Sequence, residues 1–172
     1  PNAAHAALAA LERSGRVGMV ITQNVDRLHQ RAGSSRVIDL HGRLDQVICL
    51  DCGKTQDREE VQRQLLSLNP QVEITAASAT RPDGDTYVPD DWVAALRPPA
   101  CRRCQGVIMP DVVFFGGTVP RQRVDTCMQA VDDADLLLAL GSSLQVFSGF
   151  RFCRRAAESG KPLAIVNPGT TR

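Results

Sequence analysis

Apolar positions in the first forty residues follow a helical period and then a strand-like run, twice in succession. Residues 4–13 (AHAALAALER) are good helix formers, and Ser14-Gly15 supplies a stop before the apolar run VGMVIT. Residues 26–33 (DRLHQRAG) have apolar side chains at helical spacing and end on a glycine, and the strand-like VIDL follows them. The pattern therefore predicts two consecutive helix–strand units.

The second half of the chain alternates in the same way. Expected strands are VVFF, ADLLLAL and PLAIV, and expected helices are RVDTCMQAVDDA and GFRFCRRAAESG. Alternation of this kind predicts an α/β fold with a parallel sheet, formed by residues 1–43 and 107–172. Residues 44–106 differ, because they hold cysteine pairs, the amphipathic segment EEVQRQLLSL and a Pro/Gly/Asp-rich loop, RPDGDTYVPDD. We interpret them as an inserted module.

Composition narrows the function classes. With 43% hydrophobic residues the chain can form one globular core with a small appended module. Its 20 basic and 19 acidic residues give a formal charge of +1 without any block of like charge, which argues against a dedicated nucleic-acid binder. The longest apolar runs, such as 136–140, are too short to span a membrane. The chain opens on Pro1, so we expect a fragment whose missing start could have carried a targeting signal.

Four of the six cysteines form two CxxC pairs, separated by 48 residues: Cys49 and Cys52, then Cys101 and Cys104. Four thiolates suit tetrahedral Zn²⁺ and leave no open position for water, so we predict one structural zinc ion. The gap exceeds the usual spacing of about 15 to 20 residues, so the intervening segment must loop out. A redox role for each CxxC is the less economical alternative. This use of cysteine favours a reducing compartment, the cytoplasm or the mitochondrial matrix.

Small or hydrogen-bonding residues follow four of the expected strands. In an open parallel sheet, ligands bind outside the carboxyl ends of the strands. Each of these residues alone could be a helix cap, a turn or a core hydrogen bond. Together they offer the donors and the close backbone approach that a phosphate-bearing ligand needs, which favours a nucleotide site. They are Thr22-Gln23-Asn24, His41-Gly42, Gly141-Ser142-Ser143 and Asn167.

His41 is the candidate general base at this edge. Its ordinary pKa near 6.5 suits proton transfer at neutral pH, and zinc with four thiolates does not need it as a ligand. His5 and His29 compete for the role, but His5 lies in an alanine-rich helix and we interpret His29 as structural.

Several motifs taken in order resemble the sirtuin family of NAD-dependent protein deacylases, over nearly the whole chain. They are TQNVDRLHQRAG, HG, the two CxxC pairs, PDVVFFG, GSSLQV and IVN. The stretch SLQVFSGFRF is similar to the class II branch. The resemblance implies a Rossmann-type NAD-binding domain with an inserted zinc module, and an acyl-lysine protein or peptide substrate between the two.

The resemblance also implies residue roles. His41 is implied as the catalytic base: the acyl oxygen displaces nicotinamide from the ribose, and the histidine then activates a ribose hydroxyl to attack the imidate, giving O-acyl-ADP-ribose. A segment with Val113, Phe114 and Gly116 would offer an extended edge to the substrate backbone, although Val112 and Phe115 also suit a buried core strand. Gly117 stands where the family commonly has an acidic residue. The implied NAD contacts are Gln23, Asn24 and Asp26 near the nicotinamide ribose, Gly141, Ser142 and Ser143 at the phosphates and adenosine ribose, and Asn167 near the adenosine.

The family's glycine-rich pyrophosphate loop would precede Pro1 and its last strand would follow Asn167, so activity is expected of the full-length parent and not of the fragment alone. Two alternatives stay open. One is transfer of ADP-ribose onto a protein acceptor, and the other is a zinc-ribbon interaction module without catalysis. The preferred acyl group, the protein substrates and the oligomeric state are not specified by these motifs.

Overall fold

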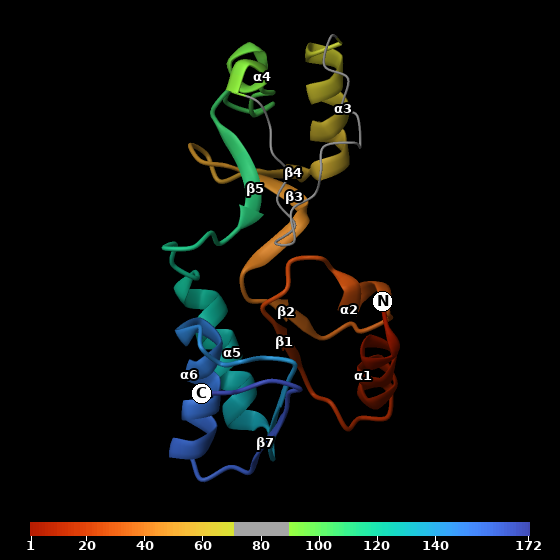
Figure 1. The fold of residues 1–172 in the computed structure, drawn as a ribbon, viewed down its shortest axis with the longest axis vertical. Coiled ribbons are helices and arrows are strands. Elements are labelled where there is room, and N and C mark those ends of the chain that lie inside the picture. The colour runs from red at the N-terminus through yellow and green to blue at the C-terminus, as the bar shows by residue number, and fades with distance from the viewer. Residues whose placement is uncertain (71–89) are drawn as a thin grey trace. The chain divides into compact units, whose positions relative to one another are not determined.

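The helices and strands of a computed structural model, which describes residues 1–70 and 90–172, follow much of this alternation (Figure 1). The described chain divides into two units. Unit 1 comprises Pro1–Arg43 and Val112–Arg172, and unit 2 comprises Leu44–Asp111. Residues 81–89 of the Pro/Gly/Asp-rich loop lie outside the described residues. The assignment of the units to a cofactor domain and a zinc module stays a prediction.

The first half of unit 1 contains the two predicted helix–strand units. Helix α1 (Ala3–Arg13) begins at the N-cap Asn2, whose side chain accepts a hydrogen bond from the His5 amide in a capping box. Strand β1 (Val20–Thr22), helix α2 (Leu28–Arg31) and strand β2 (Val37–Asp39) follow. Strands β1 and β2 are parallel, with Thr22 opposite Asp39. The carboxyl ends of both strands therefore lie together.

The second half of unit 1 alternates again, through α5 (Arg121–Asp133), β6 (Leu137–Leu140), α6 (Phe147–Glu158) and β7 (Leu163–Val166). Strands β6 and β7 are parallel, in a pair separate from β1 and β2. The predicted class, mixed α/β with parallel strands, is confirmed.

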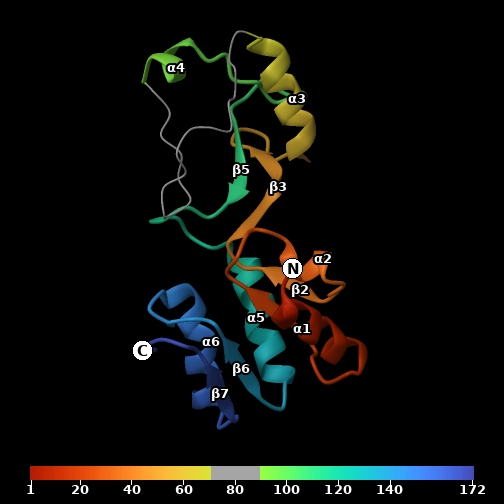
Figure 2. The same cartoon turned by 45° about the vertical axis from the view of Figure 1, so that its right-hand side comes forward.

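The core of unit 1 lies where α5 packs against α6, which run side by side in Figures 1 and 2. Partly buried Ile21 and Ile38 of β1 and β2 pack against this core. The two cysteines outside the CxxC pairs, Cys127 and Cys153, are buried, as is usual for free thiols, which behave as small apolar side chains. The core residues are Leu40, Val119, Cys127, Val131, Phe152 and Ala156.

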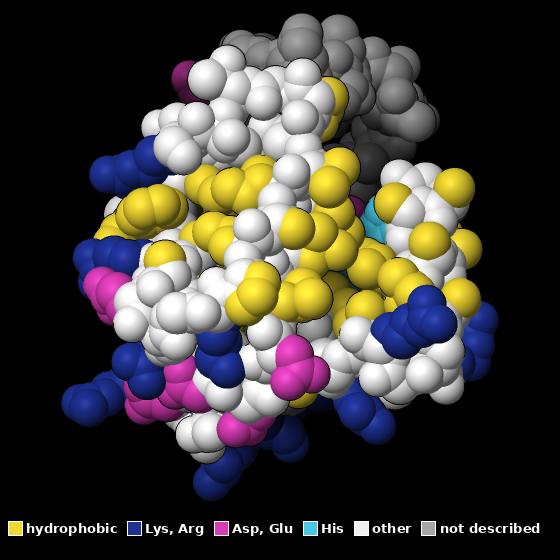
Figure 3. All heavy atoms as spheres, turned by 90° about the horizontal axis from the view of Figure 1, so that it is seen from below, with side chains coloured by type: hydrophobic (Ala, Val, Ile, Leu, Met, Phe, Trp, Pro, Cys, Tyr) yellow, Lys and Arg dark blue, Asp and Glu magenta, His cyan; other side chains and the backbone are white. Residues whose placement is uncertain are grey.

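An apolar face remains exposed on β6 and β7. Figure 3, which views the molecule from below, shows hydrophobic side chains gathered across the middle of this view, with charged side chains toward its margins. Strands of parallel sheets are normally covered on both faces, so a face of this kind is suited to pack against other protein. By the register of the pair, the exposed side chains of Leu138, Leu140 and Val166 lie on one face, and those of Leu163 and Ile165 lie on the other.

Unit 2 is built on a three-stranded sheet of order β4-β3-β5. Strand β3 (Gly42–Cys49) pairs antiparallel with β4 (Thr55–Asp57), and β5 (Ile108–Val112) lies on its other side. The side chain of Asp57 accepts hydrogen bonds from the amides at the start of α3 (Arg58–Leu68), and a short helix, α4 (Asp90–Ala95), begins the second described range. None of the helices in the described ranges is both long and apolar enough to cross a membrane.

The predicted strand VVFF is wrong in its position. The strand is β5, which ends at Val112, and the chain then turns: Gly116 has a φ of 83° and the Gly117 amide donates to the Phe114 carbonyl at 2.9 Å. Phe115 is fully exposed, so it is not a core-strand residue. An apolar run alone does not distinguish a buried strand from a turn stopped by two glycines.

Truncating the core residue Phe152 should destabilise the full-length protein strongly. Phe152 is 4% exposed within the core of unit 1, so Phe152→Ala should lower the free energy of unfolding by about 3–5 kcal/mol. Phe115→Ala is the matched control, because Phe115 is fully exposed, and it should change stability by less than about 0.5 kcal/mol. Chemical denaturation measures both, and equal effects would contradict this account of the core.

Candidate functional site

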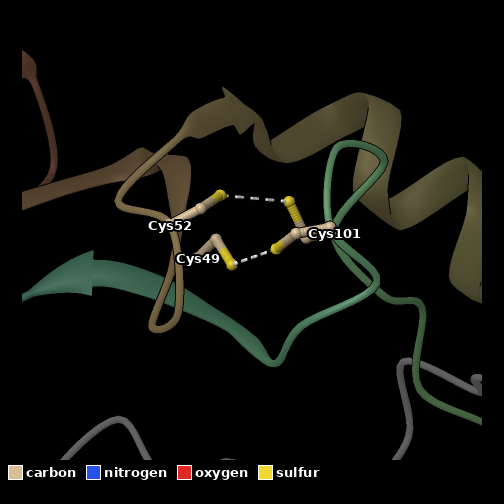
Figure 4. Close-up of side chains that lie close together, drawn as sticks. Cys49, Cys52 and Cys101 are labelled. Atoms are coloured by element: carbon tan, nitrogen blue, oxygen red, sulfur yellow. Dashed lines mark hydrogen bonds between the residues drawn. The ribbon is translucent and has the colours of Figure 1, made fainter.

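Both CxxC motifs form tight turns that direct their sulfurs to one point in unit 2. In the first turn the Gly53 amide donates to the Cys49 carbonyl at 3.0 Å, and in the second the Gln105 amide donates to the Cys101 carbonyl at 2.8 Å. Gly53 and Gln105 both have left-handed φ angles, 67° and 62°. The four sulfur atoms lie within 4.8 Å of one another, with the two motifs facing each other (Figure 4).

The distances between these sulfurs fit one zinc ion. With a Zn–S bond of about 2.3 Å, neighbouring sulfurs of a tetrahedron are about 3.8 Å apart. Cys49 Sγ lies 3.5 Å from Cys104 Sγ, and Cys52 Sγ lies 3.7 Å from Cys101 Sγ. Disulfide bonds would require a separation of about 2.0 Å, and all four cysteines are free. The cluster therefore suits a closed, structural site that cross-links β3 to the loop before β5.

The charges at the cluster favour a cation. Hydrogen bonds from the Cys104 and Arg103 amides lower the pKa of Cys101 to about 6, which favours its thiolate. At Cys104 the Gly106 amide lowers the pKa, but the sulfurs of Cys49 and Cys52 outweigh it and raise the pKa to about 12. Without a cation, repulsion between the closely spaced sulfurs opposes ionisation of all four thiols. A bound metal ion offsets that repulsion.

Two of the predicted strand ends meet directly in unit 1. The Gln23 side chain, just after β1, donates from Nε2 to Ser142 Oγ at 3.3 Å. Ser142 follows β6, and its Oγ also accepts from the Leu144 amide at 3.2 Å. The Gly141 amide donates to the Val166 carbonyl at 2.9 Å, so the end of β7 lies beside the end of β6. The structure thus brings Gln23 and Ser142 together.

His41 lies in the turn between β2 and β3, where the backbone on both sides of it is held. Its carbonyl accepts from the Val113 amide at 2.8 Å, and the preceding Leu40 amide donates to the Thr22 carbonyl at 2.8 Å. Arg123 of α5 donates to the Leu40 carbonyl at 3.2 Å. The backbone at His41 is therefore held from β1, from α5 and from the segment after β5.

The His41 ring is half-buried and mostly neutral at physiological pH. Nε2 lies 2.8 Å from Ser148 Oγ in α6. Burial lowers the pKa of His41, a hydrogen bond with the Gln23 backbone raises it, and the charge of Arg123 lowers it; the net shift is downward from 6.5. A neutral imidazole is the form that accepts a proton.

The other predicted cofactor residues have simpler local contacts. The Asn24 amide donates to Thr22 Oγ1 at 3.1 Å, and Asp26 Oδ1 accepts from the Leu28 amide at 3.0 Å. Asn167 Nδ2 donates to the Gly169 carbonyl at 3.1 Å, as in a turn, and the Ser143 carbonyl accepts from the Arg172 amide at 3.0 Å. Their ligand roles stay predictions.

The predicted substrate segment is an exposed loop joined to His41 through the Val113 amide. Phe114 is 58% exposed, and Gly116 turns the chain with its left-handed φ. The backbone after Val113 is therefore accessible beside the histidine.

Sequence reasoning missed Ser148 and Gly149 in the first turn of α6. A Cβ atom on Gly149 would lie 2.7 Å from Gln23 Nε2, so only glycine allows this approach without displacing the Gln23 side chain. Both residues lie inside the SLQVFSGFRF stretch, and a glycine in the first turn of a predicted helix was the one available signal.

The remaining histidines form a separate pair. The rings of His5 and His29 are 4.6 Å apart between centroids. Burial, and next the charge of His5, lower the pKa of His29, and its Nδ1 is buried without a hydrogen-bond partner. This pair joins α1 to α2.

Comparison with known proteins gives one family. The model of the Sir2 family matches residues 1–148. The NAD-dependent protein deacetylase of Bordetella bronchiseptica is 49% identical over the whole chain, which covers 62% of that protein, and NAD-dependent protein deacetylase 1 of Streptomyces coelicolor is 51% identical, with 57% covered. The chain thus spans about three fifths of the length of these curated relatives.

Solved structures agree in fold. A structure of Sir2 bound to acetylated peptide is 35% identical with a TM-score of 0.78, and it matches 99% of this chain and 60% of its own. A Sir2 complex with 2′-O-acetyl-ADP-ribose and deacetylated p53 peptide is 35% identical with a TM-score of 0.74, over 99% of this chain and 61% of its own.

Replacing one cysteine of the cluster should release the metal. In Cys101→Ser a tetrahedron of thiolates loses one ligand, so zinc content should fall from one ion per chain and the melting temperature should drop. Cys127→Ala is the control, because Cys127 is a free core cysteine, and its zinc content should not change. Elemental analysis and thermal unfolding of the full-length protein measure this, and a Cys101→Ser protein with full zinc would refute the four-cysteine site.

Proposed function

The chain belongs to the Sir2 (sirtuin) family, and from that premise we propose that the protein containing it is an NAD-dependent protein-lysine deacylase. The enzyme transfers the acyl group from lysine to ADP-ribose and releases nicotinamide. Because the chain spans about three fifths of its curated relatives, the activity is assigned to the whole protein and not to residues 1–172 alone.

The observation that carries the proposal is the closed set of contacts around His41. The ring has a hydrogen bond with the Gln23 backbone, and the Gln23 side chain reaches Ser142. Ser148 contacts the ring from α6, and its neighbour Gly149 packs on the Gln23 carboxamide. A neutral histidine is thus held at the carboxyl ends of β1, β2 and β6, where open α/β sheets bind their ligands.

We assign His41 the role of general base. Its ring accepts the proton of a ribose hydroxyl, which makes that hydroxyl oxygen nucleophilic toward the acyl carbon. NAD supplies the ADP-ribose acceptor and the nicotinamide leaving group. The downward shift of the His41 pKa supports the role, because the ring is then unprotonated at neutral pH.

The proposed NAD contacts lie at the carboxyl ends of β1, β6 and β7. Gln23, Asn24 and Asp26 follow β1 and offer amide and carboxylate groups to the nicotinamide ribose. Gly141 has a left-handed φ of 59°, a turn conformation of the kind in which successive backbone amides can face a phosphate. The remaining proposed contacts are Ser142 and Ser143 at the phosphates and adenosine ribose and Asn167 near the adenosine.

The acyl-lysine peptide binds along Val113, Phe114 and Gly116. This exposed segment begins at the Val113 amide that contacts His41, so a peptide paired with it in strand fashion has its acyl group near the base. The zinc site, with Cys49, Cys52, Cys101 and Cys104, stabilises unit 2 and takes no part in the chemistry. Six free cysteines agree with a reducing compartment, the cytoplasm or the mitochondrial matrix.

Removing the imidazole should abolish deacylation. In the full-length protein, His41→Ala should lower the deacylation rate by at least about 100-fold, the lower end of the usual contribution of a general base. Zinc content and melting temperature should match the wild type, since His41 is not a metal ligand. His5→Ala, in α1, is the histidine control and should keep the wild-type rate. Full turnover by His41→Ala would exclude the base role.

The pH dependence should report a histidine with a lowered pKa. Because only the neutral ring accepts a proton, kcat/KM for deacylation should rise with pH and level off, with the midpoint of the acid limb below 6.5. Activity is thus present above the lowered pKa and lost as the pH falls through it. Measuring the profile between pH 5 and 9 tests this, and a midpoint above about 7 would contradict the neutral ring.

A further inference from the structure

Ser148 directs its hydroxyl to His41 and not to its own helix. A serine at the start of a helix usually caps the first amides. Here the N-cap is Val146, which makes no side-chain cap, and Ser148 stands one residue inside α6. Its Oγ lies 2.8 Å from His41 Nε2.

The first turn of α6 packs against Gln23, the residue after β1. Gly149 is buried. A Cβ atom at this position would lie 2.7 Å from Gln23 Nε2, so the absence of a side chain leaves room for the Gln23 carboxamide. That carboxamide is fixed in turn by its hydrogen bond to Ser142 at 3.3 Å. The place of the Ser148 hydroxyl is therefore set by packing between α6 and Gln23.

The contacts of the ring distinguish its two nitrogens. The hydrogen bond with the Gln23 backbone favours the protonated ring, as a bond to a carbonyl acceptor does. Nε2 faces Ser148, so a hydrogen on Nδ1 leaves Nε2 the lone pair that accepts from the Ser148 hydroxyl. The charged group that acts on the ring is Arg123 of α5, and no carboxylate of the described residues shifts it.

We propose that Ser148 is a positioning residue for His41, whose hydroxyl holds the ring with Nε2 as the proton-accepting nitrogen until the reacting ribose hydroxyl takes its place there. This inference rests on the proposed function. In the step concerned, the ribose oxygen bonds to the imidate carbon, its O–H bond breaks, the proton goes to Nε2, and the C=N electron pair moves to nitrogen. Ser148 neither gains nor loses a proton.

The test compares Ser148→Ala with Ser148→Thr in the full-length enzyme. One lost neutral hydrogen bond should lower kcat for deacylation by roughly 3- to 10-fold in Ser148→Ala, with KM for NAD and peptide changed by less than about twofold. Ser148→Thr keeps the hydroxyl and should restore kcat. Nicotinamide exchange should persist in Ser148→Ala, because the base acts after nicotinamide has left.

A structural role alone would lower exchange and deacylation together, and that result would overturn the proposal. So would an unchanged kcat in Ser148→Ala.

Nitrogen-15 NMR of the histidine rings gives a readout independent of turnover. The wild type should show His41 with hydrogen on Nδ1, and Ser148→Ala should show exchange-broadened or mixed tautomers, while His5 and His29 stay unchanged. An identical His41 spectrum in both proteins would overturn the positioning role. A wild type that binds NAD but does not deacylate would contradict the proposed function alone, and the NMR comparison would still decide for or against Ser148.

Discussion

The parallel pairing of β1 with β2 is the constraint on which the site depends. Thr22 lies opposite Asp39, and the next ladder bond, from the Leu40 amide to the Thr22 carbonyl, continues the register by one residue. Leu40 is fully buried in the core, so the following residue, His41, cannot slip along the strand without pulling Leu40 out. Gln23 and His41 are therefore neighbours because of backbone pairing and core packing, and the first turn of α6 then packs on Gln23 and brings Ser148 to the ring.

Unit 2 depends on a different kind of interaction. Few of its described apolar side chains are buried; Val47 and Val61 are, together with Cys49 and Cys101 of the metal cluster. A core of this size gives little stability, so thiolate–metal bonds have to supply much of it. Strand β3 connects the His41 site with the cysteine cluster, because it begins directly after His41 and ends at Cys49. A single strand thus links the proposed base to a proposed zinc ligand through the chain.

Most elements, the cysteine cluster and the location of His41 could be predicted because each depends on local pattern or on motif spacing. The VVFF strand could not, because its apolar residues suit a strand while Gly116 and the bond from Gly117 to Phe114 turn the chain. Ser148 was missed for another reason: its partner is 107 residues away, and only tertiary packing brings them together. At Asp26 and Asn167 the structure shows cap-like and turn-like bonds, which leave their ligand roles as predictions.

The central claim is that the full-length protein couples the removal of an acyl group from lysine to the cleavage of NAD. The most direct measurement is the stoichiometry of products when that protein is incubated with NAD and an acyl-lysine peptide and analysed by mass spectrometry. The account predicts equal amounts of nicotinamide, deacylated peptide and O-acyl-ADP-ribose. Nicotinamide formed without deacylated peptide, with ADP-ribose attached to protein or released by hydrolysis, would contradict it.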